Sequence, residues 1–247
     1  MSEGCLARLI APHRAIISPR TRFPGCRKIR FGMDLKRQGG AVNLKPWLLR
    51  CSGWPFGPFQ LTQAIRPAPQ VVLQPQQGYR LTRYEHGRQR WPVLSAAVSA
   101  ERVFDVFLSL LVPLGDEVDV VVETSHGLPP GQCRGWRRQG IDRTVLISHL
   151  CDFEELLLHD GCTAIAVLCR RRRREVQFDE HKLLHVYAQR LGPFRRCLQR
   201  WGIPCRRHLT FICEADHWHQ TQPHYAEQVH CLLYRLAAHP SPPPYAV

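Results

Sequence analysis

Two apolar runs separated by five consecutive arginines constrain the fold more than any other feature of the sequence. Thr163 to Cys169 contains no charged residue, and Glu175 to Asp179 alternates polar and apolar residues. A connection between parallel neighbours takes a dozen residues or more, and the link here is much shorter. We therefore predict two neighbouring antiparallel strands joined by a turn, which is made of Arg170, Arg171, Arg172, Arg173 and Arg174.

Hydrophobic periodicity predicts further elements on both sides of this hairpin. Strands are expected at 79–84, 93–98, 117–124 and 208–214, and helices at 99–113, 143–159, 180–201 and 225–236, with a long loop at 125–141. Residues 117–214 then run β-α-β-β-α-β, which is a ferredoxin-like order. We expect an α+β fold with strand order 4-1-3-2, helices mainly on one face, an extra N-terminal β-β-α and a C-terminal helix. An open parallel sheet is the alternative, and the short arginine turn argues against it.

Positive charge is concentrated in two places. The chain carries 34 Lys+Arg against 20 Asp+Glu, a formal net charge of +14. Residues 1–66 hold 12 of the basic residues and only Glu3 and Asp34, whereas residues 67–247 net only +4 and include the arginine turn. A broad basic face, which phosphate neutralisation requires, is therefore not expected. Association with nucleic acid would depend on the first 66 residues or on phosphate contacts at the arginine turn.

The first 66 residues differ in composition from the rest of the chain. Prolines and glycines recur there without a helical or strand period, which is typical of a poorly ordered segment. We predict a basic tail at 1–66, a single α+β domain at 67–239 and a Pro-rich end at 240–247. Met1 and Met33 are the only methionines, so a start assigned too far upstream is an alternative explanation of the tail.

The apolar runs and the cysteines bear on location. No run approaches the roughly 18–20 apolar residues of a membrane span, so no membrane partner is expected. The 11 cysteines are odd in number and include no C-x-x-C pair. This pattern favours reduced thiols, and with no secretion signal evident it predicts a cytoplasmic protein.

Histidines and carboxylates gather at the ends of the predicted elements. In the ferredoxin-like order the strands ending at Asp179 and Glu214 are parallel, so their carboxyl ends meet at one edge of the sheet. His181 and His185 are four apart and would share one face of the predicted helix. Such mixtures suit zinc, manganese or iron. We expect a divalent metal site, if there is one, among Asp179, His181, His185, Glu214, Asp216, His217 and His219. In a parallel sheet, Glu123 and His126 would instead join Glu214 and His217.

Motifs that would identify a reaction are missing from the sequence. It contains no P-loop, no dinucleotide-binding glycine pattern and no G-x-S-x-G nucleophile elbow. The runs at 118–126, 151–157, 161–168 and 175–184 resemble an uncharacterised family of bacterial conserved hypothetical proteins, over about residues 90–236. That resemblance implies no activity, and it implies that the first 66 residues and the arginine turn are peculiar to this member.

Three functions follow as hypotheses. The first is a non-catalytic binding or regulatory module that associates with a protein partner or with itself through the open face of the sheet. That face would include Val121, Ala164, Ala166 and Ile212, which are too apolar for water. The second is a metal-dependent hydrolase using the cluster above. The third is nucleic-acid association through the basic tail.

Overall fold

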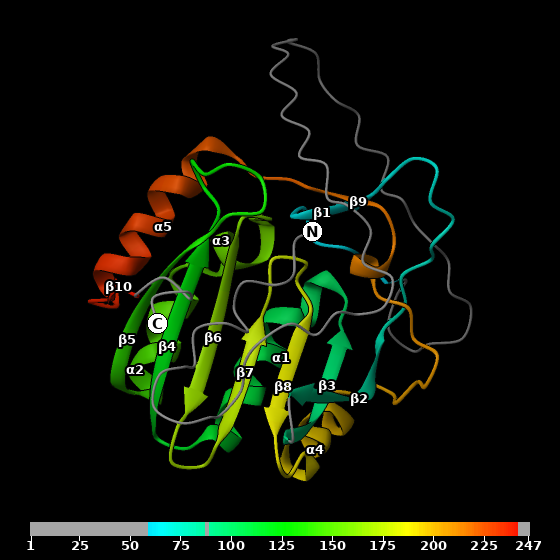
Figure 1. Cartoon of the computed structure of the whole chain (residues 1–247), viewed down its shortest axis with the longest axis horizontal. Helices are drawn as coiled ribbons and strands as arrows, with labels where there is room; N and C mark the ends of the chain where they lie inside the picture. Colours follow the sequence, from blue (N-terminus) through cyan, green and yellow to red (C-terminus); the bar gives the residue numbers. More distant parts are fainter. Residues whose placement is uncertain (1–58, 87–88, 242–247) are drawn as a thin grey trace.

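The chain forms an α+β structure built on an antiparallel sheet (Figure 1). The computed structural model describes residues 59–86 and 89–241. Within these ranges the main sheet has eight strands, in the order β10 (His239–Pro240), β5 (Arg134–Asp142), β4 (Glu117–Thr124), β6 (Thr163–Cys169), β7 (Arg174–Phe178), β8 (Leu184–Ala188), β3 (Gln89–Ala97) and β2 (Gly78–His86). A second sheet pairs β1 (Ile65–Pro67) with β9 (His217–His219).

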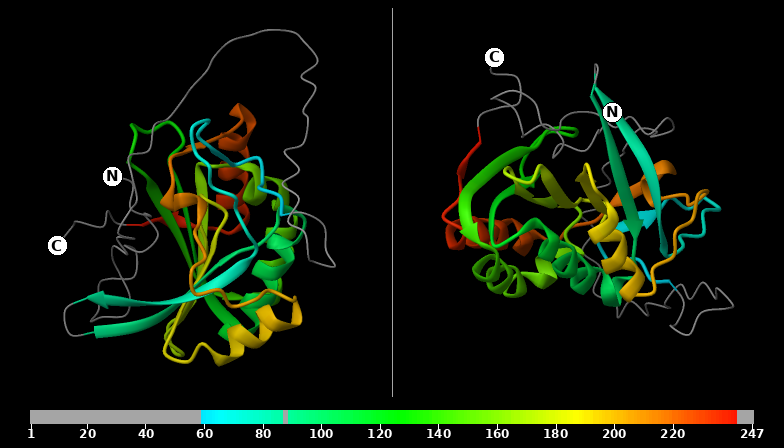
Figure 2. Two further views of the ribbon diagram at one scale, coloured as in Figure 1. Left: turned by 90° about the vertical axis from the view of Figure 1, so that its right-hand side faces the viewer. Right: turned by 90° about the horizontal axis from the view of Figure 1, so that it is seen from below.

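All five α-helices of the described ranges lie on one side of the main sheet (Figure 2). They are α1 (Ala100–Leu111), α2 (Arg143–Cys151), α3 (Glu154–His159), α4 (Gly192–Arg200) and α5 (Pro223–Arg235), with short 3-10 helices at Val112–Leu114 and Ile212–Glu214. None of the helices in the described part of the chain is long and apolar enough to cross a bilayer.

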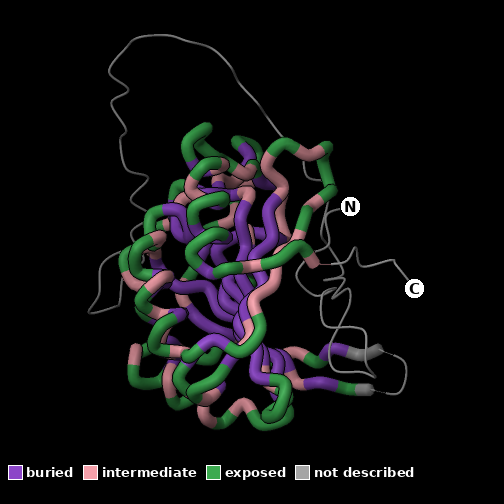
Figure 3. Tube along the Cα trace, turned by 90° about the vertical axis from the view of Figure 1, so that its left-hand side faces the viewer, coloured by how far each residue is buried: buried purple, intermediate pink, exposed green. Residues whose placement is uncertain are grey.

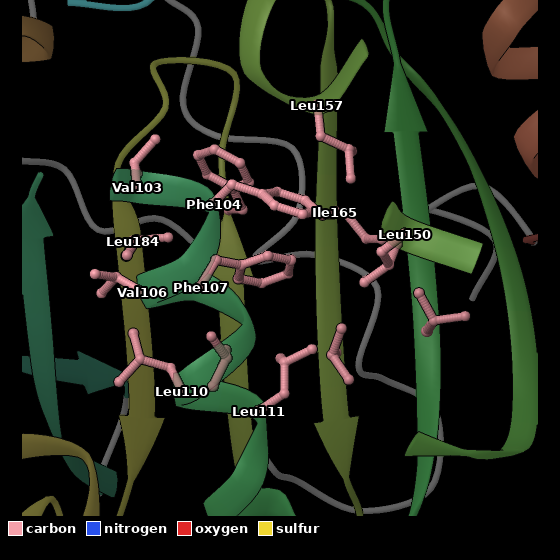
Figure 4. Close-up of a cluster of buried hydrophobic side chains, with 14 of the residues drawn as sticks. Val103, Phe104, Val106, Phe107, Leu110, Leu111, Leu150, Leu157, Ile165 and Leu184 are labelled. Carbon is pink, nitrogen blue, oxygen red and sulfur yellow. The ribbon is translucent and has the colours of Figure 1, made fainter. Parts of the chain in front are cut away.

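The core lies between α1 and the central strands. Phe104, Phe107 and Leu111 of α1 recur at helical spacing and pack toward β6, β7 and β8 (Figure 4). Phe107 and Phe178 meet with ring centroids 5.2 Å apart. The buried strands run through the middle of the molecule, with exposed loops around them (Figure 3). Burial of this apolar layer is the main stabilising contribution to the fold.

The predicted arginine hairpin is confirmed. β6 and β7 are antiparallel neighbours, with Leu168 opposite Glu175 and Cys169 opposite Arg174. The turn that joins them places Arg173 at a φ of 52°. The predicted strand 117–124 and the predicted hairpin before α1 also appear, as β4 and as β2 with β3.

The predicted ferredoxin-like strand order is not what the structure shows. The segment assigned to a long loop contains β5, which returns alongside β4 before α2 begins. β6 is consequently antiparallel to β4 and adjacent to it, rather than parallel to β4 and one strand removed. β5 was missed because its sequence, RGWRRQGID, is polar and contains two glycines, and most of it is exposed or half-buried.

The helix predicted over 180–201 is wrong in its first half. Residues 180–183 turn the chain and β8 follows, antiparallel to both β7 and β3. Leu184 and Val186 face the helices while His185 and Tyr187 face the other side, and all four are buried. With both faces buried there is no polar stripe to separate the strand period from the helical one. Only α4 forms, starting at Gly192-Pro193, where proline suits a first helical turn.

The strand predicted at 208–214 is also wrong, because this segment ends in the 3-10 helix Ile212–Glu214. The strand in this region is β9, which pairs with β1 outside the main sheet. The parallel strand ends from which the metal site was deduced therefore do not exist.

The main sheet has a second face, on the side away from the helices. Side chains alternate along a strand, so the residues between the core positions point to it. We call this surface the second face and define it by Val121, Ala166, Leu168, Glu175 and Gln177 of β4, β6 and β7.

Candidate functional site

A tight turn between β7 and β8 positions the first histidine of the site. The Asp179 backbone amide donates to the Leu183 carbonyl, and the Lys182 amide donates to the Asp179 carbonyl. This leaves a three-residue loop whose last residue, Lys182, has a φ of 60°. A left-handed residue closing such a loop is usual, but here it is a lysine, whose side chain is buried and donates to the Thr163 carbonyl at 2.9 Å. The loop holds His181 at its tip.

The other two histidines come from β9. His217 and His219 are two residues apart on a strand and therefore share one face, while Trp218 between them points outward. β9 is fixed by its pairing with β1 and by a backbone bond from Gly161 to the Gln220 carbonyl. The approach is so close that a methyl group on Gly161 would lie 2.4 Å from the Ala64 carbonyl oxygen.

The three imidazoles meet where the β7–β8 turn faces β9. Their ring centroids are 5.0 Å apart for His181 and His217, 4.8 Å for His181 and His219, and 5.2 Å for His217 and His219. One nitrogen from each ring lies within 4.8 Å of the other two. His181 is 6% exposed and His217 4% exposed, so the cluster is almost closed to solvent.

Each ring uses its Nδ1 atom for a bond that points away from the centre. Nδ1 of His181 bonds the Asp179 carboxylate at 3.1 Å. Nδ1 of His217 bonds the Ala215 carbonyl, and Nδ1 of His219 bonds the Gly161 carbonyl, both at 2.7 Å. These acceptors require the proton on Nδ1, which leaves Nε2 as a lone pair. The Nε2 atoms of His181 and His217 are buried and have no hydrogen-bond partner.

Asp179 is the centre of a buried hydrogen-bond chain behind His181. One carboxylate oxygen bonds both His181 and Nε2 of His185, the latter at 3.2 Å, and the other accepts from the Leu183 amide. Nδ1 of His185 meets the Ser95 hydroxyl at 2.9 Å. Ser95 is fully buried, so this Ser-His-Asp sequence of contacts has no accessible nucleophile and instead fixes the carboxylate that orients His181.

The ionisation of these groups follows from their surroundings. Burial acts to raise the pKa of Asp179, but His181 and His185 outweigh it and the net pKa is lowered. For His181 burial lowers the pKa, Asp179 raises it more, and the net pKa is raised. Burial lowers the pKa of His217, and it lowers that of His219 to about 3. The two β9 histidines are therefore neutral at physiological pH, as metal ligands must be.

The structure brings together five of the seven residues predicted for a metal site. His181, His217 and His219 form the cluster, and Asp179 and His185 lie behind it. Glu214 is elsewhere: it pairs with Arg80 and accepts from the Phe211 amide. Asp216 is half-buried, and its backbone carbonyl accepts from Ala68. The reasoning behind His181 and His185 was wrong, because they lie on a turn and a strand instead of one helix face.

The predicted arginine contacts are largely satisfied within the chain. Arg170 pairs with Asp119 at 2.8 Å, and Arg174 donates to the Pro113 carbonyl at 2.6 Å. The Arg173 guanidinium lies over the Trp91 ring at 5.2 Å. Arg171 and Arg172 are exposed.

A second polar cluster lies directly beside the histidines. Asp160 is fully buried and bonds His126 at 2.8 Å, the Cys162 amide at 3.2 Å and the Thr221 hydroxyl at 2.5 Å. Burial raises the pKa of Cys162, which keeps it a thiol. The hydrogen bonds already satisfy Asp160, so this group anchors the Gly161 carbonyl that holds His219. The sequence prediction missed Ser95, Asp160 and Gly161, since only the fold reveals their contacts.

A surface depression leads to the site. It is lined by His181 and Lys182 from the β7–β8 turn, by Phe59 and Thr62, and by Phe211 and Ile212. A small ligand with an apolar part could lie against these walls and reach His181.

Comparison of the chain with protein-family models, with curated proteins and with solved structures finds no match. The case for a function rests on the geometry of the histidine cluster.

Proposed function

We propose that the protein binds a divalent transition metal, zinc in the first instance, through Nε2 of His181, His217 and His219, and that the bound metal activates water for hydrolysis. The observation that carries the proposal is the division of labour in each ring: Nδ1 is bonded to an outward acceptor, and a nitrogen of each ring faces the common centre. Ligating histidines in metalloproteins have this arrangement, with a carboxylate or carbonyl on the second nitrogen.

The ligand set favours zinc over harder cations. Imidazole nitrogens suit zinc, iron and manganese less equally than carboxylates do, and magnesium or calcium would require oxygen ligands. Tetrahedral zinc with Zn–N distances of about 2.0–2.1 Å needs nitrogens about 3.3–3.5 Å apart. The ligand atoms here lie within 4.8 Å of one another, so small side-chain movements would close the site.

Three protein ligands leave a fourth position for water. Zinc held in this way lowers the pKa of its water to about 7, which supplies a nucleophile at neutral pH. Asp179 would strengthen His181 as a ligand, and the buried ammonium of Lys182 would offset negative charge that develops on a substrate. The depression beside His181 supports access by a small substrate.

Metal content of the full-length protein, purified without a histidine tag, tests the first part. We expect about one zinc, manganese or iron per chain by mass spectrometry of the metal, or uptake of one zinc after chelation. His217→Ala should abolish this stoichiometric binding, while the matched control His208→Ala, at an exposed site, should not. A wild-type chain that neither contains nor takes up metal would refute the site.

Turnover of activated carboxylic and phosphate esters by zinc-loaded protein tests the second part. We expect hydrolysis that is lost on chelation, restored by zinc and absent in His217→Ala. Stoichiometric zinc binding without hydrolysis of any ester would leave a structural metal site and reject the hydrolase.

A further inference from the structure

The second face of the main sheet is buried, although the elements described above leave it uncovered. Val121 is 1% exposed, Leu168 3% and Glu175 1%. The helices all lie on the opposite side, where Val120, Val167 and Val176 face them (Figure 2). Small apolar and buried polar side chains in the middle of a sheet need cover from another layer.

Glu175 makes the need for cover specific. One of its carboxyl oxygens accepts from the Gln177 amide at 2.5 Å, and the other, Oε2, is buried with no hydrogen-bond partner. A buried polar atom of this kind is costly unless a neighbouring backbone or side chain bonds to it. Glu175 points into the second face, beside the groove floor formed by Ala164, Ala166 and Val121.

A cysteine at one edge of the sheet shows which part of the chain is close. Cys133, immediately before β5, is disulfide-bonded. The seven other cysteines of the described ranges are free. Since the chain has 11 cysteines, the partner of Cys133 is one of Cys5, Cys26 and Cys51. The expectation that all thiols are reduced is therefore wrong for Cys133.

The described chain begins at the opposite end of the same face. Phe59 packs against Ala97 of β3 and Leu183, both of which face away from the helices. Five interstrand steps of about 4.8 Å, roughly 24 Å, separate β3 from β5. The eight residue steps between Cys51 and Phe59 span at most about 27 Å, and those from Cys26 or Cys5 span far more. Each of the three cysteines can therefore reach Cys133 by a path across the sheet.

We propose that the segment preceding Phe59 lies across the second face and is fastened at its far edge by the disulfide to Cys133. The groove floor of small side chains suits bulky ones above it, and the segment carries Trp47, Trp54 and Phe56. The occupant of the open face is then this chain's own basic segment, and the face is closed to a partner while the disulfide is intact. This inference is independent of the metal site.

Peptide mapping of the full-length protein under non-reducing conditions tests the tether. We expect the peptide that contains Cys133 to be linked to a peptide containing Cys5, Cys26 or Cys51, in a species that remains monomeric. A free Cys133 thiol, or a Cys133 linkage between two copies of the chain, would refute it.

Photo-crosslinking of the full-length protein tests the path. Tyr187 is buried on the same face, and Tyr187→p-benzoylphenylalanine places a photoreactive ketone there with little change in shape. We expect intramolecular adducts with residues before 59, and none from the same group at Val72, which is 96% exposed. Adducts confined to residues 59–241, adducts between copies, or no adduct at Tyr187 would each contradict the proposal.

Discussion

The two nitrogens of each clustered histidine do different work, and this distinction separates a ligand set from a chance gathering of rings. His181, His217 and His219 each bond an acceptor through Nδ1. Two of these acceptors are backbone carbonyls, which cannot give up or take a proton. The tautomer of His217 and His219 is therefore set by the fold itself.

Replacing Asp179 tests this control at a single residue. Asp179→Asn keeps the shape of the side chain, and its oxygen can still accept from Leu183, but an amide NH₂ cannot accept from Nδ1 of His181. We expect zinc affinity to fall by about 10–100-fold with little loss of fold, measured by competition with a chelator. Asp152→Asn, at a half-exposed surface ion pair, is the matched control. An affinity for Asp179→Asn within threefold of wild type would show that Asp179 does not orient the ligand.

At the scale of single residues, the sequence indicated most of the cluster for reasons that were partly wrong. Asp179, His181 and His217 were named because they follow predicted strands, and they do meet. They meet through a hairpin turn facing a short strand rather than through parallel strand ends. Glu214 was named on the same argument and pairs with Arg80 instead, because the strand assumed to end there does not form.

Secondary-structure elements were predictable where one face was polar and the other apolar. α1 and β4 have that contrast, and their bounds were close to those observed. β8 is buried on both faces and β5 is polar on most of its length, so neither carries the alternation that identifies a strand. Tertiary contacts decide both elements, and those contacts are not visible in a local window.

The junction between β9 and the start of β6 depends on one glycine. Gly161→Ala would place a methyl group 2.4 Å from the Ala64 carbonyl and 2.8 Å from the Gln220 carbonyl. We expect a loss of about 1–3 kcal/mol in the free energy of unfolding. Zinc affinity should fall as well, since Gly161 also holds His219.

Chemical denaturation and zinc titration of the same samples would measure both effects. Gly192→Ala is the control, because its nearest neighbour would be an arginine nitrogen at 3.7 Å and alanine suits a helix. Unchanged stability in Gly161→Ala would mean that the two backbones are not in contact.

For the whole molecule, the buried carboxyl of Glu175 links stability to pH. Burial raises its pKa to about 8, against an ordinary value of 4.5, and the bond from Gln177 opposes the shift only in part. The folded state therefore holds a proton that the unfolded state releases, and stability falls as pH rises from about 4.5 to about 8.

Glu175→Gln removes this proton uptake while keeping the acceptor for Gln177. We expect the variant to match wild type near pH 4.5 and to exceed it by a few kcal/mol at pH 8 and above, measured by urea unfolding across that range. Glu227→Gln, at an exposed site on α5, should show no such divergence. The buried His217 and His219 act in the opposite sense at low pH, and they are common to both proteins. Parallel curves for Glu175→Gln and wild type would mean that Glu175 is ionised in the folded chain.

The ligands of the candidate metal site belong to different sheets: His181 to the turn of the eight-stranded sheet, and His217 and His219 to the two-stranded one. An ion between them would connect the two sheets directly. The ribbon of β1 and β9 could then open only by giving up a ligand. The rate at which the protein releases its metal should accordingly match the slow exchange of the amides in that ribbon, and both should be far slower than rotation of the rings themselves.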